Sequence, residues 1–444
     1  MVVASVDPTI PLTGRQIVEK SMLETGRKTK IVMVVLLLII AKGAWEYKRQ
    51  YTEGLGVTGL TTKIFWGLYI SNFVFFIGVS HAGTLISAIL RVTGADWRTP
   101  ITRLAEEITV LALIFGAASV FIDMGHLDRV INVVRYGNID SPLVWDFISI
   151  TFYLIGSAIF LYLPLIPDFA YYRDNLSDEY RIRKFFYRIL AIGWEGTEEQ
   201  YELLEKNIKK MSFIIIPVAV SVHTVVSWIM SMMFRTGWSS TIFGPYFVVG
   251  AIFSGLAALL TAMVLFTTFY NLQVYLKREH FVNLSKLLVT FAAFYAYFTI
   301  SEYLTEAYRG EENTLELLMQ IFYGDYAVLF WYFILGGLLI PVLILIVVIS
   351  NPQLSDRVVM TMIFIATIMI NIGMWIKRYL ITVPAQAAPT VDEGWHSYTP
   401  NSVEVWIFAA QISGFIFLYI LLSKLVPVIS LWEVEHEEEL KKNK

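Results

Sequence analysis

The chain has 444 residues, of which 56% are hydrophobic and only 16% are charged, and its formal net charge is -3. This composition excludes an ordinary soluble domain, and charges that gather in loops give no reason to expect nucleic acid as a partner. There are no cysteines, so the chain itself cannot ligate an iron–sulfur cluster, attach a c-type haem or form a disulfide.

Ten stretches are long and apolar enough to cross the roughly 30 Å hydrocarbon core of a bilayer. The first of them is the weakest, because Lys42 and Glu46 lie near its end and must reach the interface. The pattern predicts an all-α polytopic membrane protein of about ten transmembrane helices, occupying 31–430. The expected spans are 31–47, 65–90, 107–125, 144–166, 211–233, 246–270, 284–306, 327–350, 357–378 and 403–427.

The orientation follows from the positive charges. Most of the 34 Lys and Arg residues lie in the N-terminal segment 1–30, in the loops after the even-numbered spans and in the tail 431–444. Because such loops face the cytoplasm, we expect both termini and the charged loop 167–210 on that side. The expected location is the cell (inner) membrane, with multiple passes.

A polar cluster ends the third span. The stretch FIDMGHLDRV, 121–130, contains Asp123, His126, Asp128 and Arg129, which the orientation places at the outer face. If the helix continues, Asp123 and His126 share a face, and a carboxylate beside an imidazole increases its basicity. A quinol head group needs hydrogen-bond partners and a proton acceptor. The cluster therefore predicts a quinone site in which Asp123 and His126 are catalytic.

Three further polar residues reach the same half of the membrane from spans five, seven and nine. Ionisable groups inside spans cost at least about 2.5–3.5 kcal/mol, so they face the protein interior. We expect the quinone to be bound by the four residues of the cluster together with His223, Glu302 and Arg378.

A second set of polar groups lies in the inner half of the membrane. His81 falls inside the second span, and Arg91, Glu106 and Glu107 lie near the inner ends of the second and third spans. These four residues are candidates for a cytoplasmic proton route. For Arg91, Glu106 and Glu107, the alternative is that they simply lie at the membrane interface and have no role in proton transfer.

Other interpretations of the same residues stay open. The acids and bases can be structural pairs, such as Glu302 with Arg378. A b-type haem between His81 and His223 would need both histidines at one depth, whereas the span boundaries place them at different depths. With six histidines and no cysteine, no metal site is expected.

Two other functional classes are also compatible with a helical membrane protein. One is a proton- or ion-coupled secondary transporter, for which helices interrupted by Pro217 and Pro341 would be suitable. The other is a purely structural membrane anchor, which would not need the outer polar cluster.

Three stretches resemble a known family. IFWGLYISNFVFFIGVSHAGTLISAILR resembles the signature helix of the NrfD-type family, the quinone-reactive membrane subunits related to that of polysulfide reductase. SVHTVVSWIMSMMFRTGWSSTIFGPYFVVGAIFSG and NIGMWIKRYLITVP resemble two further regions of its ten-span branch. That branch includes the membrane subunits of alternative complex III and of sulfur-metabolism complexes. The resemblance extends from about residue 60 to 430.

The resemblance implies two four-helix bundles with flanking helices, and neither haem nor iron–sulfur cluster on this chain. It implies menaquinone or ubiquinone as substrate, oxidised or reduced at the outer face beside an iron–sulfur subunit. A further redox subunit would be a multihaem cytochrome or a molybdenum or sulfur enzyme, and proton translocation is a further expected coupling. The similar small-residue patterns GVSHAGTLISA and VVGAIFSGLAALLTA also suggest duplicated halves.

The cluster after the third span departs from the family pattern, which often reads His-Leu-Gly-Arg-Pro or Asp-Leu-Gly-Arg-Pro. Here the segment reads DMGHLDR, so Asp123 matches the acid position while His126 and Leu127 replace Arg and Pro. We expect Arg129 to supply the displaced positive charge.

Overall fold

The computed structural model describes residues 14–95, 97–389 and 394–442, and within these ranges all regular secondary structure is helical. The predicted all-α membrane fold is confirmed. Within the described residues, nine helical stretches are long and apolar enough to cross a membrane. They are α3 (Leu68–Val92), α4 (Thr99–Asp123), α6 (Pro142–Asn175), α8 (Glu198–Ser231), α9 (Phe243–Tyr270), α10 (Arg278–Arg309), the stretch Ala327–Ser350, α14 (Asp356–Ala387) and α15 (Ser402–Leu425).

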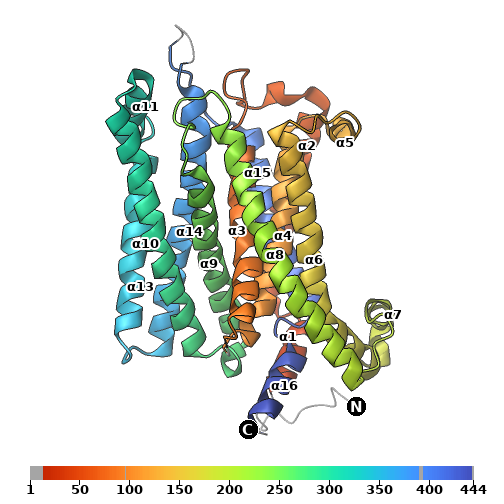
Figure 1. Ribbon diagram of the computed structural model, residues 1–444. Helices are drawn as coiled ribbons and strands as arrows, with labels where there is room; N and C mark the ends of the chain where they lie inside the picture. The colour runs from red at the N-terminus through yellow and green to blue at the C-terminus, as the bar shows by residue number, and fades with distance from the viewer. Residues whose placement is uncertain (1–13, 96, 390–393, 443–444) are drawn as a thin grey trace.

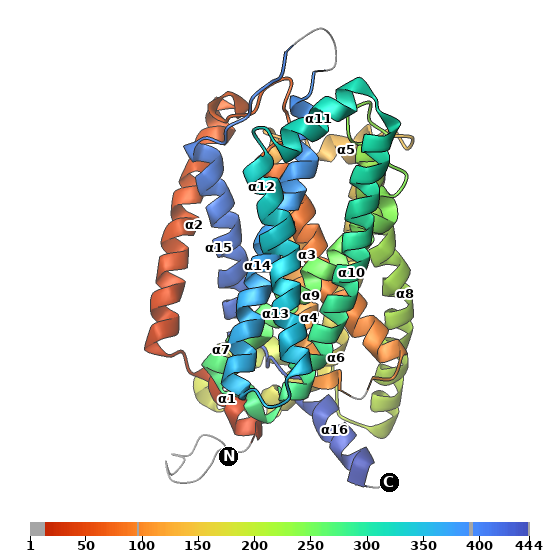
Figure 2. The ribbon, with the colours of Figure 1, turned by 90° about the vertical axis from the view of Figure 1, so that its left-hand side faces the viewer.

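The stretch 327–350 is composite, because α12 (Ala327–Trp331) and α13 (Ile340–Ser350) are joined by a π-helical segment, η5 (Tyr332–Leu339). The first expected span lies in α2 (Arg27–Glu53), which runs alongside α15 at the edge of the molecule (Figure 2). Exposed apolar side chains cover its outer face, as expected of a helix in contact with lipid. They include Ile31, Val35 and Leu38.

The long helices form two four-helix bundles, as predicted. α3, α4, α6 and α8 pack together, and α9, α10, α13 and α14 form the second group. α2 and α15 flank the first bundle, and α3 packs on α9 to join the two (Figure 1). Small residues allow this approach, since a Cβ atom on Gly78 of α3 would lie only 3.2 Å from the Ser254 hydroxyl of α9.

Short helices lie at the two ends of the bundles. α1 (Gly14–Leu23), α7 (Arg181–Leu190) and α16 (Leu431–Lys442) lie at one end, and α5 (Ile131–Arg135) and α11 (Glu312–Phe322) lie at the other (Figure 1). The expected loop 167–210 is shorter than predicted, because α6 continues to Asn175 and α8 begins at Glu198. The remaining single turns are η1 (Leu55–Val57), η2 (Leu127–Arg129), η3 (Asp178–Tyr180) and η4 (Leu272–Val274).

Candidate functional site

The predicted outer cluster is divided between a buried and an exposed part. Asp123 is the last residue of α4, and Gly125, with φ of +72°, turns the chain away from the helix. The helix therefore does not continue, and Asp123 and His126 do not share a helical face. His126, Asp128 and Arg129 are exposed, and the His126 Nδ1 atom lies 3.6 Å from the Asp128 carboxylate.

Asp123 lies among polar groups from three helices. Its Oδ1 atom is buried and has no hydrogen-bond partner. Gln50 of α2 accepts a hydrogen bond from the Tyr69 hydroxyl at 2.6 Å and donates to the Ile122 carbonyl at 2.9 Å, directly before Asp123. Tyr69 and Glu404 are both close enough to Asp123 to interact with it electrostatically.

Glu404 is a fully buried carboxylate on α15 that is held by several donors. Its Oε2 atom accepts a hydrogen bond from the Gly59 backbone at 2.7 Å, and its Oε1 atom accepts one from the Tyr398 hydroxyl. Tyr398 lies outside the spans, and burial together with Glu404 raises the pKa of its phenol. This tyrosine therefore remains a donor, and it accepts a bond from the Leu68 backbone at the start of α3. The loop after α2 is thereby fixed over this end of the bundle.

His81 and His223 are in direct contact. Their ring centroids are 3.8 Å apart with planes at 71°, so the prediction that they lie at different depths is wrong. His81 Nε2 donates to the Ala219 carbonyl at 2.8 Å, while His81 Nδ1 and both nitrogens of His223 are buried without partners. Axial haem ligands lie on opposite faces of an iron, so rings in direct contact exclude a haem between this pair.

Arg378 lies beside the two histidines where the bundles meet. Its guanidinium lies 5.3 Å from the centroid of Phe247, and its Nη2 atom has no hydrogen-bond partner. A Cβ atom on Gly250 would lie 3.0 Å from that Nη2 atom, so the space for the guanidinium depends on this glycine. Arg378 also interacts electrostatically with both His81 and His223. The structure thus groups His223 and Arg378 with His81.

Glu302 belongs to a third group, in the second bundle. Its carboxylate lies 3.0 Å from Lys377 Nζ, and both side chains are buried. The expected pair of Glu302 with Arg378 is therefore wrong, since the neighbouring lysine takes that position. Lys377 also donates to the Tyr303 hydroxyl at 2.9 Å, with its ammonium 4.6 Å from the ring centroid. Sequence reasoning missed Lys377, although it lies next to a predicted site residue.

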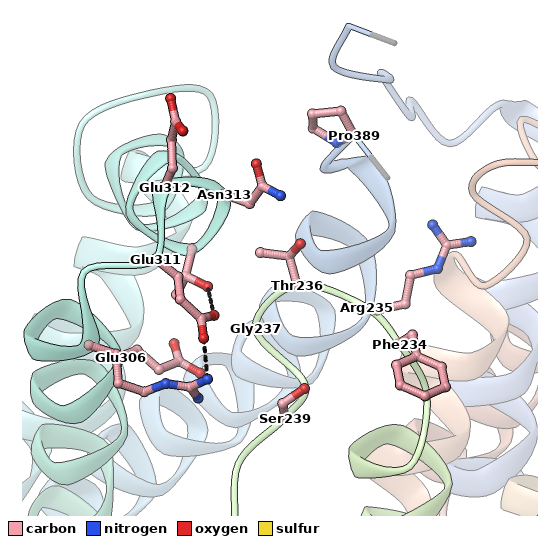
Figure 3. A pocket seen from close by; sticks show the side chains of 12 residues that line it. Phe234, Arg235, Thr236, Gly237, Ser239, Glu306, Glu311, Glu312, Asn313 and Pro389 are labelled. Carbon is pink, nitrogen blue, oxygen red and sulfur yellow. Dashed lines mark hydrogen bonds and ion pairs between the residues drawn. The ribbon is translucent and has the colours of Figure 1, made fainter. Parts of the chain in front are cut away.

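Two cavities open near these groups. One, of 530 Å³, is lined mainly by polar residues of the α8–α9 loop and of α10 and α11, and Glu306, one turn from Glu302, is among them (Figure 3). Arg309 and Glu311, which form an ion pair, both line it. The other, also of 530 Å³, lies between α8 and α9 and is mainly apolar, with Trp228 in its wall.

The four candidate proton-route residues lie in the first bundle. Glu106 and Glu107 are 3% and 0% exposed, so both are buried inside the protein. Glu106 accepts a hydrogen bond from Ser87 at 2.7 Å, whereas both carboxylate oxygens of Glu107 lack partners. Arg91 is bound at 2.9 Å to Glu433 of α16, a partner that the sequence did not indicate.

Hydroxyl groups of α3, α4 and α6 meet around Thr84, which lies between His81 and Ser87 on α3. The Thr84 backbone donates to the Thr109 hydroxyl at 3.1 Å, and the Thr84 hydroxyl lies 3.3 Å from that of Ser157. Sequence reasoning missed these residues as well. The signal for Thr84 was its spacing from Ser80 and Ser87 by three or four positions, which puts the three residues on one face of α3.

The protein is thus a multi-pass helical membrane protein. Its two four-helix bundles bury acids, bases and histidines within the membrane-spanning part. In the part of the chain that the structure describes, no group of three or more His, Asp and Glu residues is arranged to hold a metal ion. The family model described as polysulphide reductase, NrfD, matches residues 56–390. The chain belongs to that family, as the sequence resemblance predicted.

Three curated proteins are similar over nearly the full length. A putative membrane subunit of dimethyl sulfoxide reductase from Halobacterium salinarum is 28% identical over 86% of this chain and 87% of its own. A subunit of selenate reductase from Mesobacillus selenatarsenatis is 26% identical over 92% and 96%. The integral membrane subunit of the Hdr-like menaquinol oxidoreductase from Archaeoglobus fulgidus is 23% identical over 91% and 96%.

Proposed function

We propose that this chain is the quinone-reactive membrane subunit of an oxidoreductase complex. It oxidises menaquinol or ubiquinol, or reduces the quinone, at the end of the first bundle where Asp123 lies. Because the chain has no cysteine to ligate a cluster, the electrons pass to or from an iron–sulfur partner and then a further redox subunit. The names of the three relatives support this assignment, since each is a subunit of a reductase or of a menaquinol oxidoreductase.

The observation that carries the proposal is the unpartnered Asp123 oxygen. A buried polar atom without a hydrogen bond costs about 1–3 kcal/mol, so such an atom at the end of a span indicates a ligand or a proton-transfer role. Asp123 Oδ1 is such an atom, and the family pattern also has an acid there. A quinol hydroxyl would donate to this carboxylate and lose its proton to it. The exposed His126 then passes the proton to water.

The sidedness of the reaction follows from the charges. Lys and Arg gather at the end that carries α1, α7 and α16, which we assign to the cytoplasm of the cell membrane. Asp123 lies at the end of α4 where α5 and the η2 turn follow, so quinol oxidation would release protons outside.

We further assign the inner polar groups to proton uptake. The route runs from Glu106 and Glu107 through the Thr84, Thr109 and Ser157 hydroxyls to His81. His223 and Arg378 would then act with His81 inside the bundle instead of contacting the quinone. Glu302 would form a structural ion pair with Lys377 and would not contact the quinone. If a His81→Ala chain showed unchanged proton translocation and quinol turnover, the proposed proton route through His81 would be wrong.

The decisive experiment is Asp123→Asn in the intact complex, measured by quinol-dependent electron transfer. Losing a proton acceptor costs typically 10²–10⁴-fold in rate, and we expect a loss in the lower part of that range. The matched control is Asp140→Asn, an exposed acid after α5, which should leave the rate unchanged. Co-purification of the partner subunits shows that assembly is retained. Full activity in a chain carrying both Asp123→Asn and His126→Ala would overturn the proposed site.

A further inference from the structure

The helix α7 exposes an apolar stripe. Its sequence, RIRKFFYRIL, places large apolar residues at i, i+3, i+4 and i+7, on one face. These side chains are strongly exposed, with Ile182 at 76%, Phe185 at 59%, Phe186 at 55% and Ile189 at 55%. Contiguous apolar surface of this kind marks an interaction site and does not normally face water.

The opposite face of α7 fixes its position. Tyr187 is buried, stacks on Phe169 of α6 with centroids 5.7 Å apart, and donates its hydroxyl to the carbonyl of Leu425, the last residue of α15. Tyr162 of α6 donates to the Leu190 carbonyl at the end of α7, at 2.6 Å. Figure 1 shows α7 at the side of the lower ends of α6 and α8.

The depth of this attachment can be derived from α6. Pro142 begins α6 at the opposite end of the bundle, and Tyr162 lies twenty positions later, which corresponds to ~30 Å of helix. That is the thickness of the hydrocarbon core of a bilayer, about 30 Å. If α6 enters the core near Pro142, Tyr162 and the end of α7 lie at the boundary between acyl chains and headgroups. The exposed stripe therefore meets lipid.

A second stripe on α7 is basic. Arg181, Lys184 and Arg188 are spaced by three and four positions, so they share a face beside the apolar one. Lys184 is paired with Asp178 at 2.9 Å, while Arg181 and Arg188 are exposed. A helix with an apolar face and a basic flank is typical of helices that lie in the membrane interface, where they attract anionic headgroups.

We propose that α7 is an interfacial helix that binds anionic phospholipid. Ile182, Phe185, Phe186 and Ile189 insert between acyl chains, and Arg181 and Arg188 bind the phosphate-bearing headgroups. The charge of the basic stripe and the depth fixed by Tyr162 and Tyr187 favour lipid over a protein partner as the occupant. This binding is independent of the quinone site.

The first test measures depth. The chain has no cysteine, so Phe185→Cys gives one site for a nitroxide label in the complex reconstituted in vesicles containing phosphatidylglycerol. We expect the label to collide with oxygen more than with a water-soluble nickel chelate, as labels in lipid do. Glu199→Cys, on the exposed first turn of α8, should show the opposite preference. Ile189→Cys repeats the measurement if the first variant is unstable.

Two outcomes would overturn the proposal. A label at 185 with the same preference as at 199 would place α7 in water. A label sheltered from both reagents in the intact complex would show that another protein covers it.

The second test separates charge from insertion. In the chain with Arg181→Gln and Arg188→Gln, retention of phosphatidylglycerol over phosphatidylcholine, measured by native mass spectrometry, should fall roughly fivefold for each charge removed. The matched chain with Arg181→Lys and Arg188→Lys keeps both charges and should retain most of the preference. Equal lipid retention in all three chains would contradict anionic lipid binding at α7.

Discussion

Two buried polar sites, one in each four-helix bundle, are arranged in different ways. In the second bundle, the Lys377 ammonium is matched by the Glu302 carboxylate and enclosed by aromatic rings. In the first bundle, Asp123 and Glu107 have oxygens without partners and His223 has two free ring nitrogens. A paired lysine and glutamate hold the helices in one arrangement, whereas proton transfer needs donors and acceptors that are not already hydrogen-bonded. We infer that the open groups of the first bundle carry the chemistry and that the pair of Glu302 with Lys377 is mainly structural.

The largest effect should come from breaking the ion pair of the second bundle. Lys377→Met leaves the Glu302 carboxylate buried without its cation, which costs about 3–5 kcal/mol of stability. We expect a marked loss of thermal stability in detergent. The chain with both Lys377→Met and Glu302→Gln should recover most of it, because no charge is left unpaired.

An exposed ion pair at the junction of α10 and α11 gives the control. Arg309 and Glu311 are 51% and 55% exposed, so Arg309→Gln should cost less than about 1 kcal/mol. If Lys377→Met were as harmless as Arg309→Gln, the view of the second bundle as a closed structural unit would be wrong.

The next effect tests the inner end of the first bundle. Glu433 of α16 accepts a hydrogen bond from Arg91 at 2.9 Å and lies 3.9 Å from Arg98. Burial alone opposes the charged form, but Arg91 and Arg98 outweigh it and lower the pKa of Glu433. The contact is therefore fully present above the unfolded pKa of about 4.3. It is lost as the pH falls through the lower folded pKa.

Hydrogen exchange in α16 measures this contact. We expect α16 to be protected at neutral pH, to lose protection progressively below about pH 4.3, and to open as the pH falls through the lower folded pKa. Glu433→Gln should weaken the docking by about 1.5–3 kcal/mol already at neutral pH. Glu435→Gln is the control, since that residue forms an exposed pair with Arg15. Protection that does not change with pH or with Glu433→Gln would show that α16 is held by apolar packing alone.

The sequence predicted the positions of the helices along the chain better than the rotation of each helix about its axis. Hydropathy located the span 284–306 inside α10, because apolar length is encoded locally. It did not show which of Lys377 and Arg378 faces Glu302, because neighbouring residues on a helix point about 100° apart. Only packing against α10 and α9 decides that choice.

The candidate site shows the same limit. The acid at Asp123 could be predicted from the end of an apolar run. The end of α4 at this residue could not be predicted, although Gly125 was a visible signal for a positive φ. The contact of His81 with His223 depends on the relative shift of α3 and α8. An error of a few residues in the span boundaries places two touching residues at different depths.

The smallest effect separates structure from proton transfer within the first bundle. Ser157→Ala removes the hydroxyl that lies 3.3 Å from that of Thr84. Losing one neutral hydrogen bond costs only about 0.5–1.5 kcal/mol, so the complex should assemble and oxidise quinol at nearly the normal rate. Because the hydroxyl lies between Glu106 and His81 in the proposed route, proton translocation per electron should fall. Ser221→Ala, on an exposed hydroxyl of α8 that donates to its own helix, should change neither quantity. A normal proton yield in the Ser157→Ala chain would mean that protons bypass this hydroxyl, and the contrast between the bundles would then be one of packing only.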